Sequence, residues 1–431
     1  MPSSEKYREC LEHMFNLRRF GIKLGLSTIT AILEGLDNPQ DAYSCIHIAG
    51  TNGKGSIAST IASILLAAGH SVGLYTSPHL VRFNERISVN GSPITDEEVF
   101  TAYQAVKSLQ MPEREPTFFE FTTAMALHEF KRKKVDWAVI ETGMGGRLDA
   151  TNVLHPSLCI ISNISIEHKS YLGSTIKEIA GEKGGIIKKN TPVITGVYQQ
   201  QAICVIEAIA KERSAPLFRL GKDFKTRRLA GGGFFYSGIE KIFKAIEPAL
   251  AGDHQVENTA MAIAACEVLN SNGTAQISDT DMIKGIANVT WPGRLEVVSR
   301  QPRVILDGAH NLGAARQLAK HLAKTEKGRK VTMVVGILDD KPYRSILKIL
   351  LPFCTRLFLT RARIARALPP EILRETASKL VEDITIIEDV GSAFQKAVSA
   401  SGPEETVCVA GSLYVVGETK EWLEANPLKE P

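Results

Sequence analysis

Short apolar runs alternate with longer amphipathic segments along most of this chain. The run at 44–49 (SCIHIA) predicts a strand, and residues 56–69, after a glycine-rich loop, predict a helix that ends at Gly69. Further strand-like runs stand at 135–141, 157–165 and 192–197, with helical patterns between them. This alternation predicts an α/β fold with a mostly parallel sheet covered by helices.

The pattern weakens between Arg219 and Glu240, where GGGFFYSG indicates a hairpin and an antiparallel edge. A helical stretch at 255–269 and the turn TWPGR then precede five new apolar runs: PRVILD, KVTMVVG, RLFLT, ITIIED and TVCVAG. A chain of 431 residues exceeds the usual size of one core. We therefore predict two domains, 1–290 and 291–431, the second a smaller Rossmann-like α/β domain with its boundary near Trp291.

Composition narrows the class of protein. The 51 basic and 47 acidic residues leave a charge of +4, too small for a nucleic-acid footprint. Seven scattered cysteines without a CxxC pair argue against a disulfide framework and a zinc site, and favour a cytoplasmic location. The N-terminus has no apolar signal region, and no run approaches the roughly 20 apolar residues of a spanning helix. We expect no membrane partner.

The loop GTNGKGS, Gly50 to Ser56, is the first candidate site. Its glycines free backbone N–H groups at a helix N-terminus, which favours phosphate, and Lys54 adds a full charge. It departs from GxxxxGK[ST], because Gly55 follows the lysine and Ile48 occupies the first glycine position. From spacing alone, Ser56 would be the residue whose hydroxyl binds Mg²⁺. The alternative to a phosphate-binding loop is a simple glycine turn between a strand and a helix.

Other polar groups follow predicted strands. Ser77 lies in YTSPHLVRFNERI, which could equally be a surface loop. Glu141 ends an apolar run and opens ETGMGGRLDATN. Walker-type NTPases hold Mg²⁺ with an acidic residue in such a position. A helix-capping or turn role is the alternative for Glu141. His168 favours a structural role when it is considered alone, and Lys183 fits a solvated surface charge.

The second domain carries two similar strand-end turns. LDGAHN at 306–311 and AGSLYVVGE at 410–418 each end an apolar run and open a helical one. Together with the phosphate loop they predict a ligand cleft between the domains, with Arg294 facing it.

These motifs together resemble one family. GTNGKGS, YTSPHLVRFNERI, TFFEFTTA, ETGMGGRLDATN, EKGGIIK, WPGRLEVV, LDGAHN and AGSLYVVGE, in this order, are similar to the folylpolyglutamate synthase and dihydrofolate synthase family of the Mur-ligase superfamily. The resemblance runs from about residue 20 to the end and looks most like bifunctional members. It implies a P-loop ATPase domain followed by a glutamate-ligase domain.

The resemblance also implies the reaction. ATP would phosphorylate a carboxylate, and L-glutamate would displace the phosphate to form an amide, first on dihydropteroate and then as γ-linked additions to reduced folates. Alternatives are folylpolyglutamate synthesis only, or another Mur-type amino-acid ligase. The implied cofactors are ATP and two Mg²⁺ ions, with a monovalent cation such as K⁺ as a further candidate. The resemblance also implies that the protein is a monomer and that its only partners are small molecules.

The resemblance assigns roles residue by residue. For ATP it gives Thr51, Asn52, Gly53, Lys54, Gly55, Ser56, Asn258, Arg294 and Asp307; for Mg²⁺, Ser77, Glu141 and His168; and for glutamate, His310 and Ser412. For the pterin it gives Lys23, Leu24, Gly25, Leu26, Thr117, Phe118, Phe119, Glu120, Leu148, Asp149 and Ala150. Lys183 matches a lysine that the family carbamylates with CO₂, and the catalytic set is Lys54, Glu141, His168 and Lys183. Lys23 and Glu167 depart from the aspartates common in the family.

Two other readings stand beside this one. A peptidoglycan-precursor ligase would carry a UDP-sugar domain before the phosphate loop, and Lys54 leaves too little chain for it. A nucleotide-gated binding protein that has lost ligase chemistry need not keep Lys54, Glu141, His168 and Lys183 together.

Overall fold

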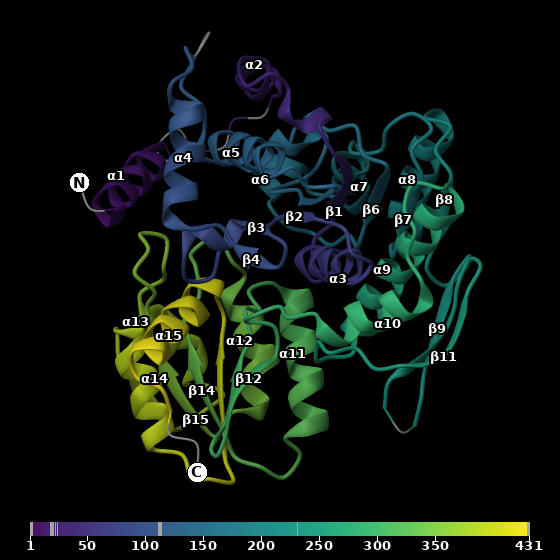
Figure 1. Cartoon of the computed structure of the whole chain (residues 1–431). Helices are drawn as coiled ribbons and strands as arrows, with labels where there is room; N and C mark the ends of the chain where they lie inside the picture. The colour runs from purple at the N-terminus through teal and green to yellow at the C-terminus, as the bar shows by residue number, and fades with distance from the viewer. Residues whose placement is uncertain are drawn as a thin grey trace. The chain divides into compact units, whose positions relative to one another are not determined.

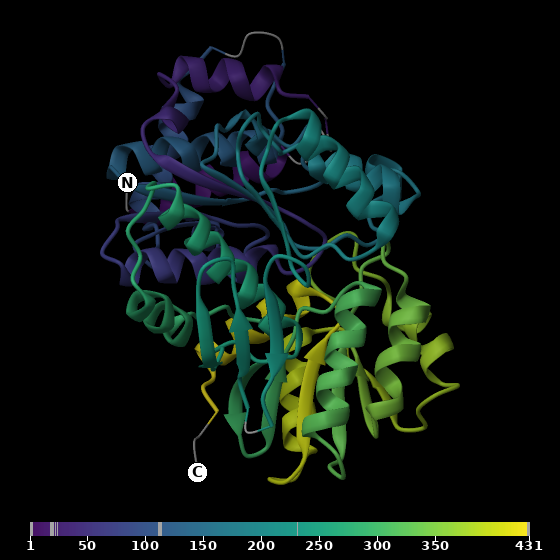
Figure 2. The same cartoon turned by 90° about the vertical axis from the view of Figure 1, so that its right-hand side faces the viewer.

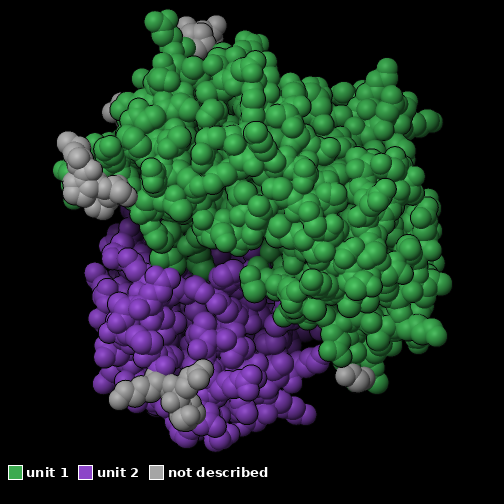
Figure 3. Space-filling view, viewed as in Figure 1, with its two compact units in different colours: residues 1–249, 255–290 green, residues 250–254, 291–431 purple. Residues whose placement is uncertain are grey.

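The chain forms two compact units. The computed structural model describes residues 3–17, 21, 23, 25–110, 114–230 and 232–428. Unit 1 comprises residues 1–249 and 255–290, and unit 2 comprises 250–254 and 291–431 (Figure 3). Segment 250–254 groups with unit 2, a detail that a single boundary near Trp291 does not include.

An eight-stranded sheet forms the centre of unit 1, with the strand order β4-β3-β2-β5-β1-β6-β7-β8. Only β3 and β4 run antiparallel to their neighbours, so the predicted mostly parallel sheet is confirmed. The strands are β1 (Ser44–Ala49), β2 (Val72–Tyr75), β3 (Ile87–Val89), β4 (Ser92–Pro93), β5 (Trp137–Glu141), β6 (Leu158–Ile161), β7 (Val193–Thr195) and β8 (Leu217–Arg219).

Helices cover both faces of this sheet because its central strands are apolar on both sides (Figure 1). Ile46 and Ile48 of β1 pack with α3 (Lys54–Ala67), α9 (His254–Ser271) and α10 (Asp279–Asn288). Cys45 packs in the opposite core. The remaining helices of unit 1 are α1 (Ser3–Asn16), α2 (Ser27–Gly35), α4 (Asp96–Lys107), α5 (Phe118–Lys133), α6 (Lys169–Leu172), α7 (Ile176–Gly184) and α8 (Gln200–Glu212).

The predicted hairpin exists, but it is no edge of the main sheet. Strands β9 (Lys225–Arg228), β10 (Phe234–Ser237) and β11 (Ile242–Ile246) form a separate antiparallel sheet (Figure 2). Glu267 of α9 holds the β10–β11 turn, since its buried carboxylate accepts hydrogen bonds from the Tyr236 hydroxyl and from the N–H groups of Glu240 and Lys241. Those bonds fix the hairpin on α9.

Unit 2 is a second α/β layer structure. Its sheet has the order β12-β13-β17-β14-β15-β16, in which only β12 is antiparallel. The strands are β12 (Glu296–Arg300), β13 (Arg303–Leu306), β14 (Val331–Val335), β15 (Arg356–Leu359), β16 (Ile384–Ile386) and β17 (Thr406–Ala410). The helices are α11 (Leu312–Thr325), α12 (Tyr343–Leu350), α13 (Pro370–Ala377), α14 (Val390–Ser399) and α15 (Leu413–Ala425). The five predicted runs form β13 to β17. Among all described residues, no helix combines the length and apolarity needed to cross a bilayer.

Candidate active site

The glycine loop connects β1 to α3 where two glycines are sterically required. Gly53 precedes α3 with φ +86°, and a Cβ there would lie 2.6 Å from Asn258 Oδ1 on α9. A Cβ on Gly50 would lie 1.8 Å from Ser162 Oγ. The loop backbone is therefore packed directly against α9 and the segment after β6, with its first helical N–H groups at the N-terminus of α3.

Gly53→Ala is expected to weaken ATP binding by about tenfold, since the added methyl group displaces Asn258 or the loop itself. The matched control is Gly69→Ala at the other end of α3, where φ is +89° and no atom lies within 4 Å of the added Cβ. Both variants carry similar backbone strain, so titration with a fluorescent nucleotide isolates the loop effect. Equal nucleotide affinity in the two variants would contradict this role for Gly53.

The segment after β6 holds the loop through hydrogen bonds. Asn163 accepts the Thr51 N–H through its carbonyl and the Asn52 N–H through Oδ1, both at 2.9 Å. Its Nδ2 and the Ser162 hydroxyl donate to the Asn52 carbonyl at 2.9 and 2.7 Å. Ser162 and Asn163 are not among the predicted site residues, although their position directly after a predicted strand is a signal of the same kind as that of Glu141.

Ser56, the hydroxyl chosen from spacing alone, is turned towards α9. The residue is 4% exposed, and its Oγ accepts a hydrogen bond from Gln255 Nε2 at 3.3 Å. Gln255 Oε1 in turn accepts from Asn258 Nδ2 at 2.9 Å. The chain of bonds links the first turn of α3, which also contains Gly55, to the Asn258 that packs on Gly53.

Glu141 meets Lys54 and Ser77 at the carboxyl ends of three neighbouring parallel strands. Lys54 Nζ lies 3.6 Å from Glu141 Oε1, and Glu141 Oε2 accepts the Ser77 N–H at 3.2 Å. The registers explain this meeting, because Ile48 pairs with Glu141 while Tyr75 pairs with Ile140. The Glu141 side chain is 6% exposed, so the pair is only weakly screened by solvent.

Lys183 is buried, so its interpretation as a solvated surface charge is wrong. The residue is 1% exposed, and Nζ donates to the Gly50 carbonyl at 2.9 Å and to Glu167 Oε1 at 2.7 Å. Lys54 Nζ donates to the same Gly50 carbonyl at 3.0 Å. Burial lowers the pKa of Lys183 against the opposing effect of Glu167. Burial raises the pKa of Glu167, but Lys183 and Lys54 outweigh it and leave that pKa lowered.

Glu141 and Ser77 supply oxygen donors of the kind that Mg²⁺ prefers. His168 follows Glu167 at φ +44°, just before α6, and its side chain is exposed. Within the described part of the chain, no three His, Cys, Asp or Glu side chains gather as a metal site. One carboxylate and one hydroxyl fit an ion that takes its other ligands from water and phosphate, as Mg²⁺ does.

The predicted pterin segments lie around the N-terminus of α5. Glu120 completes a capping box with Thr117 and receives two hydrogen bonds from Arg114 at 2.7 and 2.9 Å, so its carboxylate is already engaged. The rings of Phe118 and Phe119 are partly buried, with the Arg86 guanidinium 5.1 Å from the Phe118 centroid. A Cβ on Gly143 would lie 2.4 Å from Phe119, which places the loop after Glu141 on that ring.

The other pterin segments are placed as follows. Asp149 precedes the 3₁₀ turn η4 (Ala150–Val153), with Leu148 partly buried beside it, and Asp149 Oδ2 accepts the Met144 N–H at 2.8 Å. Lys23 is exposed, Gly25 and Leu26 directly precede α2, and Leu24 lies outside the described residues.

Unit 2 has its own set of predicted residues at one edge of its sheet. Buried Asp307 follows β13 and accepts the N–H groups of Leu295 and Ala309, each at 2.9 Å; burial raises its pKa, and Arg294 opposes that rise. A Cβ on Gly308 would lie 2.8 Å from Arg294 Nη1. His310 Nδ1 lies 2.8 Å from the Gly308 carbonyl, and buried Ser412 caps α15. The Gly411 N–H donates to the Ala309 carbonyl at 3.1 Å, which joins the two turns.

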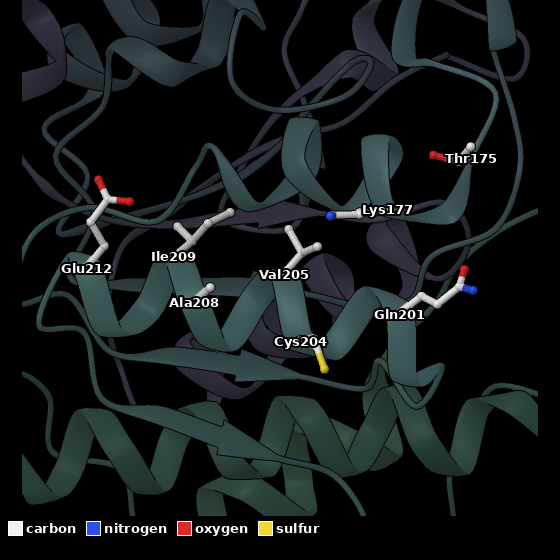
Figure 4. A pocket seen from close by; sticks show the side chains of 8 residues that line it. All are labelled: Thr175, Lys177, Gln201, Cys204, Val205, Ala208, Ile209 and Glu212. Carbon is white, nitrogen blue, oxygen red and sulfur yellow. The ribbon is translucent and has the colours of Figure 1, made fainter.

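A groove of about 810 Å³ lies between α7 and α8 (Figure 4). Its sides are formed by Thr175, Lys177, Gln201, Cys204, Val205, Ala208, Ile209 and Glu212. None of the predicted site residues lines it, so this groove is separate from the phosphate loop.

Comparison with known proteins gives the family. The Mur ligase middle domain model matches residues 48–266, and the Mur ligase glutamate ligase domain model matches 293–413. Dihydrofolate synthase/folylpolyglutamate synthase of Bacillus subtilis is 37% identical over 97% of this chain and 99% of its own length. The structure of Escherichia coli FolC in complex with DHPP and ADP is similar at 30% identity and TM-score 0.90, covering 97% of this chain and 98% of that one.

A second solved structure agrees in both fold and extent. It is the bifunctional folylpolyglutamate synthase/dihydrofolate synthase of Yersinia pestis, complexed with AMPPNP and Mn ion, at 30% identity and TM-score 0.87. The alignment covers 97% of this chain and 98% of the Yersinia chain. The two matched domains, the sequence identities and the nearly complete coverage confirm the family that the sequence motifs indicated. This chain belongs to the dihydrofolate synthase/folylpolyglutamate synthase family of Mur ligases.

Proposed function

We propose that this protein joins L-glutamate to 7,8-dihydropteroate and adds γ-linked glutamates to reduced folates, with ATP converted to ADP and phosphate. The observation that carries the proposal is the convergence of Lys54, Glu141 and Lys183 at the start of the phosphate loop. The Lys54 ammonium group and a buried carboxylate at a helix N-terminus suit phosphoryl transfer, which needs positioning and charge neutralisation, and Lys183 is a buried amine placed against the same loop.

The first half-reaction is activation of the acceptor carboxylate. A carboxylate oxygen bonds to the γ-phosphorus of ATP, the bond from that phosphorus to the bridging oxygen breaks, and ADP leaves. Gly53 and the first turn of α3 offer backbone N–H groups, whereas the N–H groups of Thr51 and Asn52 bond to Asn163 and hold the loop in shape. Ser56 links the loop to Gln255 and Asn258 of α9, and Lys54 neutralises charge that develops on the transferred group. The L-glutamate amine then displaces phosphate from the acyl phosphate and loses a proton.

We assign two Mg²⁺ ions to this site, held by Ser77, Glu141 and His168 together with a carbamate on Lys183. When bound, Mg²⁺ neutralises phosphate charge and polarises the transferred group. Carbamylation suits a buried amine whose pKa is lowered, because only the neutral amine attacks CO₂, and it replaces a positive charge by a negative one. The suggestion of K⁺ rests on the resemblance alone.

The remaining residues divide between the substrates. For the pterin we propose the surroundings of Phe118 and Phe119, because flat aromatic faces stack on a flat heterocycle, together with 23–26 and 148–150. For unit 2 we propose Arg294 and Asp307 as nucleotide contacts and His310 and Ser412 as glutamate contacts. Ser412 is the least accessible of these, since it is 2% exposed and its hydroxyl caps α15. A cleft between the units stays a prediction.

We further propose that the enzyme works as a monomer in the cytoplasm, with small molecules as its only partners. Each of its seven cysteines is unpaired in the described structure, which suits a reducing compartment. Sedimentation of the purified chain at two concentrations tests the monomer, and a concentration-dependent mass would contradict it.

The decisive assay measures ADP release by purified protein with ATP, Mg²⁺ and L-glutamate, and with either dihydropteroate or tetrahydrofolate as acceptor. Turnover with both acceptors is the expected result. Turnover with tetrahydrofolate alone would restrict the protein to folylpolyglutamate synthesis. ADP release with neither acceptor would contradict the proposal.

A further inference from the structure

A buried histidine in β1 donates a hydrogen bond away from the phosphate loop. His47 is fully buried, and its Nε2 lies 2.7 Å from Thr151 Oγ1. Because the Thr151 hydroxyl donates its single proton to Asp149 Oδ1 at 2.5 Å, His47 Nε2 must carry the proton of the first bond. Burial lowers the pKa of His47 to about 3, which agrees with a neutral ring. His47 Nδ1 has no hydrogen-bond partner among the described residues.

The chain of hydrogen bonds ends on a carboxylate that joins two segments. Asp149 is 5% exposed; Oδ1 accepts the N–H and hydroxyl of Thr151, and Oδ2 accepts the Met144 N–H at 2.8 Å. Burial raises the pKa of Asp149, and these hydrogen bonds act against that rise. The carboxylate therefore fixes the turn at 150–153 against the loop that follows Glu141.

That loop contacts both the proposed acceptor site and the helix of Lys183. Gly143 has no room for a side chain, because the ring of Phe119 would lie 2.4 Å from a Cβ there. On the other side, the Arg147 N–H donates to the Glu182 carbonyl at 2.7 Å. A displacement at Met144 would thus move the backbone that supports Phe119, next to the residues proposed to hold the pterin.

The side chain of His47 lies on the face of β1 opposite α3, the helix that follows the phosphate loop. Ile46 and Ile48 point into the core that contains α3, whereas Cys45, two residues before His47, packs in the opposite core. His47 itself bonds to Thr151, on the side opposite α3. Loss of its hydrogen bond therefore acts first on the loop after Glu141, and we expect a smaller effect on the phosphate loop, which that loop reaches through Glu182 and Lys183.

We propose that His47 and Thr151 are positioning residues that set the affinity for the pterin acceptor, by fixing the Asp149 carboxylate against the Met144 N–H. The inference rests on the proposed function for its acceptor. Both carboxylate oxygens of Asp149 accept hydrogen bonds from other residues of the protein. The Asp149 side chain therefore shapes the pterin site by holding the backbone of the loop at Met144.

The test compares Thr151→Val, which removes the hydroxyl at nearly constant shape, with Thr151→Ser, which keeps it. The Kd and KM for dihydropteroate should rise about tenfold in Thr151→Val, as expected for a lost hydrogen bond to a charged group, with kcat changed less than KM. Thr151→Ser should stay within about twofold of wild type, and the Kd for ATP should stay unchanged in both. Wild-type acceptor affinity in Thr151→Val, an equal defect in Thr151→Ser, or an equal loss of ATP affinity would overturn the inference.

A second pair covers the case in which Thr151→Val does not fold. His47→Gln keeps an N–H donor at a similar distance from the backbone, and His47→Leu removes it. We expect the leucine variant alone to lose acceptor affinity, and equal affinity in the two variants would overturn the proposal. Because dihydropteroate binding is followed by its fluorescence, a wild-type protein that binds this acceptor without ligating it would contradict the proposed function while the variants still decide the inference. A wild-type protein that does not bind dihydropteroate would overturn both.

Discussion

Lys54→Ala is expected to lower kcat/KM for ligation by about a thousandfold, the loss typical of removing one preorganised group that stabilises transition-state charge. Lys54 Nζ donates to the carbonyls of Gly50 at 3.0 Å and Thr51 at 3.4 Å and lies 3.6 Å from Glu141 Oε1, so three oxygens hold the ammonium at the phosphate loop before substrate binds. Its removal leaves the Glu141 carboxylate without its cation and the transferred phosphoryl group without a counter-charge. ADP release under saturating ATP and acceptor measures the effect.

Lys131→Ala is the matched control, because it also removes a lysine that bonds to a carbonyl and a carboxylate, those of Asp37. That ion pair is largely exposed and lies outside the proposed site, so the control should keep nearly full activity. If Lys54→Ala were folded and retained near wild-type turnover, the loop would not be the phosphate site.

The sequence predicted the parallel sheets well because buried parallel strands are continuous apolar runs. The run at 44–49 became β1 with the same ends, and the five runs of the second half became β13 to β17. The antiparallel hairpin near residue 235 was harder to place. Nothing in GGGFFYSG indicates that its turn is held by Glu267, a residue of α9 about 30 positions later, and so the sequence pattern alone does not show that the hairpin belongs to a separate sheet.

Site residues that follow the end of a predicted strand can be found from the sequence. Residues that act from inside a strand cannot. Lys54 and Glu141 follow apolar runs, so topology alone brings them to one edge of the sheet. His47 stands inside the run SCIHIA, where a histidine is simply a polar residue in a strand pattern. Its hydrogen bond to Thr151, 104 positions away, depends on the three-dimensional packing of η4 under β1.

Burial was the other quantity that sequence could not supply. Lys183 fits a surface charge in the sequence and Glu120 is predicted at the pterin site, yet the two residues are 1% and 2% exposed. The hydrogen-bond partners of the two residues show that their roles differ. Both oxygens of Glu120 are taken by Arg114 and its own capping box, which is a structural use. Lys183 instead points at the Gly50 carbonyl, in the phosphate loop, where a change in its charge would act on the nucleotide.

Lys183→Ala is expected to lower ligase turnover by at least about a hundredfold, and added acetate should restore part of it. The truncated side chain leaves space beside Glu167 and Gly50, and a short carboxylate placed there would supply the negative charge that we assign to the carbamate. Removing CO₂ and bicarbonate from the wild-type assay should lower turnover in the same direction, since the modification is reversible. Initial rates of ADP release across an acetate series give the measurement.

The control lies in the same EKGGIIK segment. Lys188 donates to the Asn152 carbonyl at 2.8 Å, and its pKa is likewise lowered by burial, but it does not contact the phosphate loop in the described structure. Lys188→Ala should keep most of its activity and should not respond to acetate, which separates rescue from a general salt effect. Restoration of Lys183→Ala by methylamine in place of acetate would assign the role to the ammonium group that pairs with Glu167. A folded, ATP-binding Lys183→Ala that acetate fails to restore would equally contradict the carbamate, because the missing group would then not be a simple carboxylate.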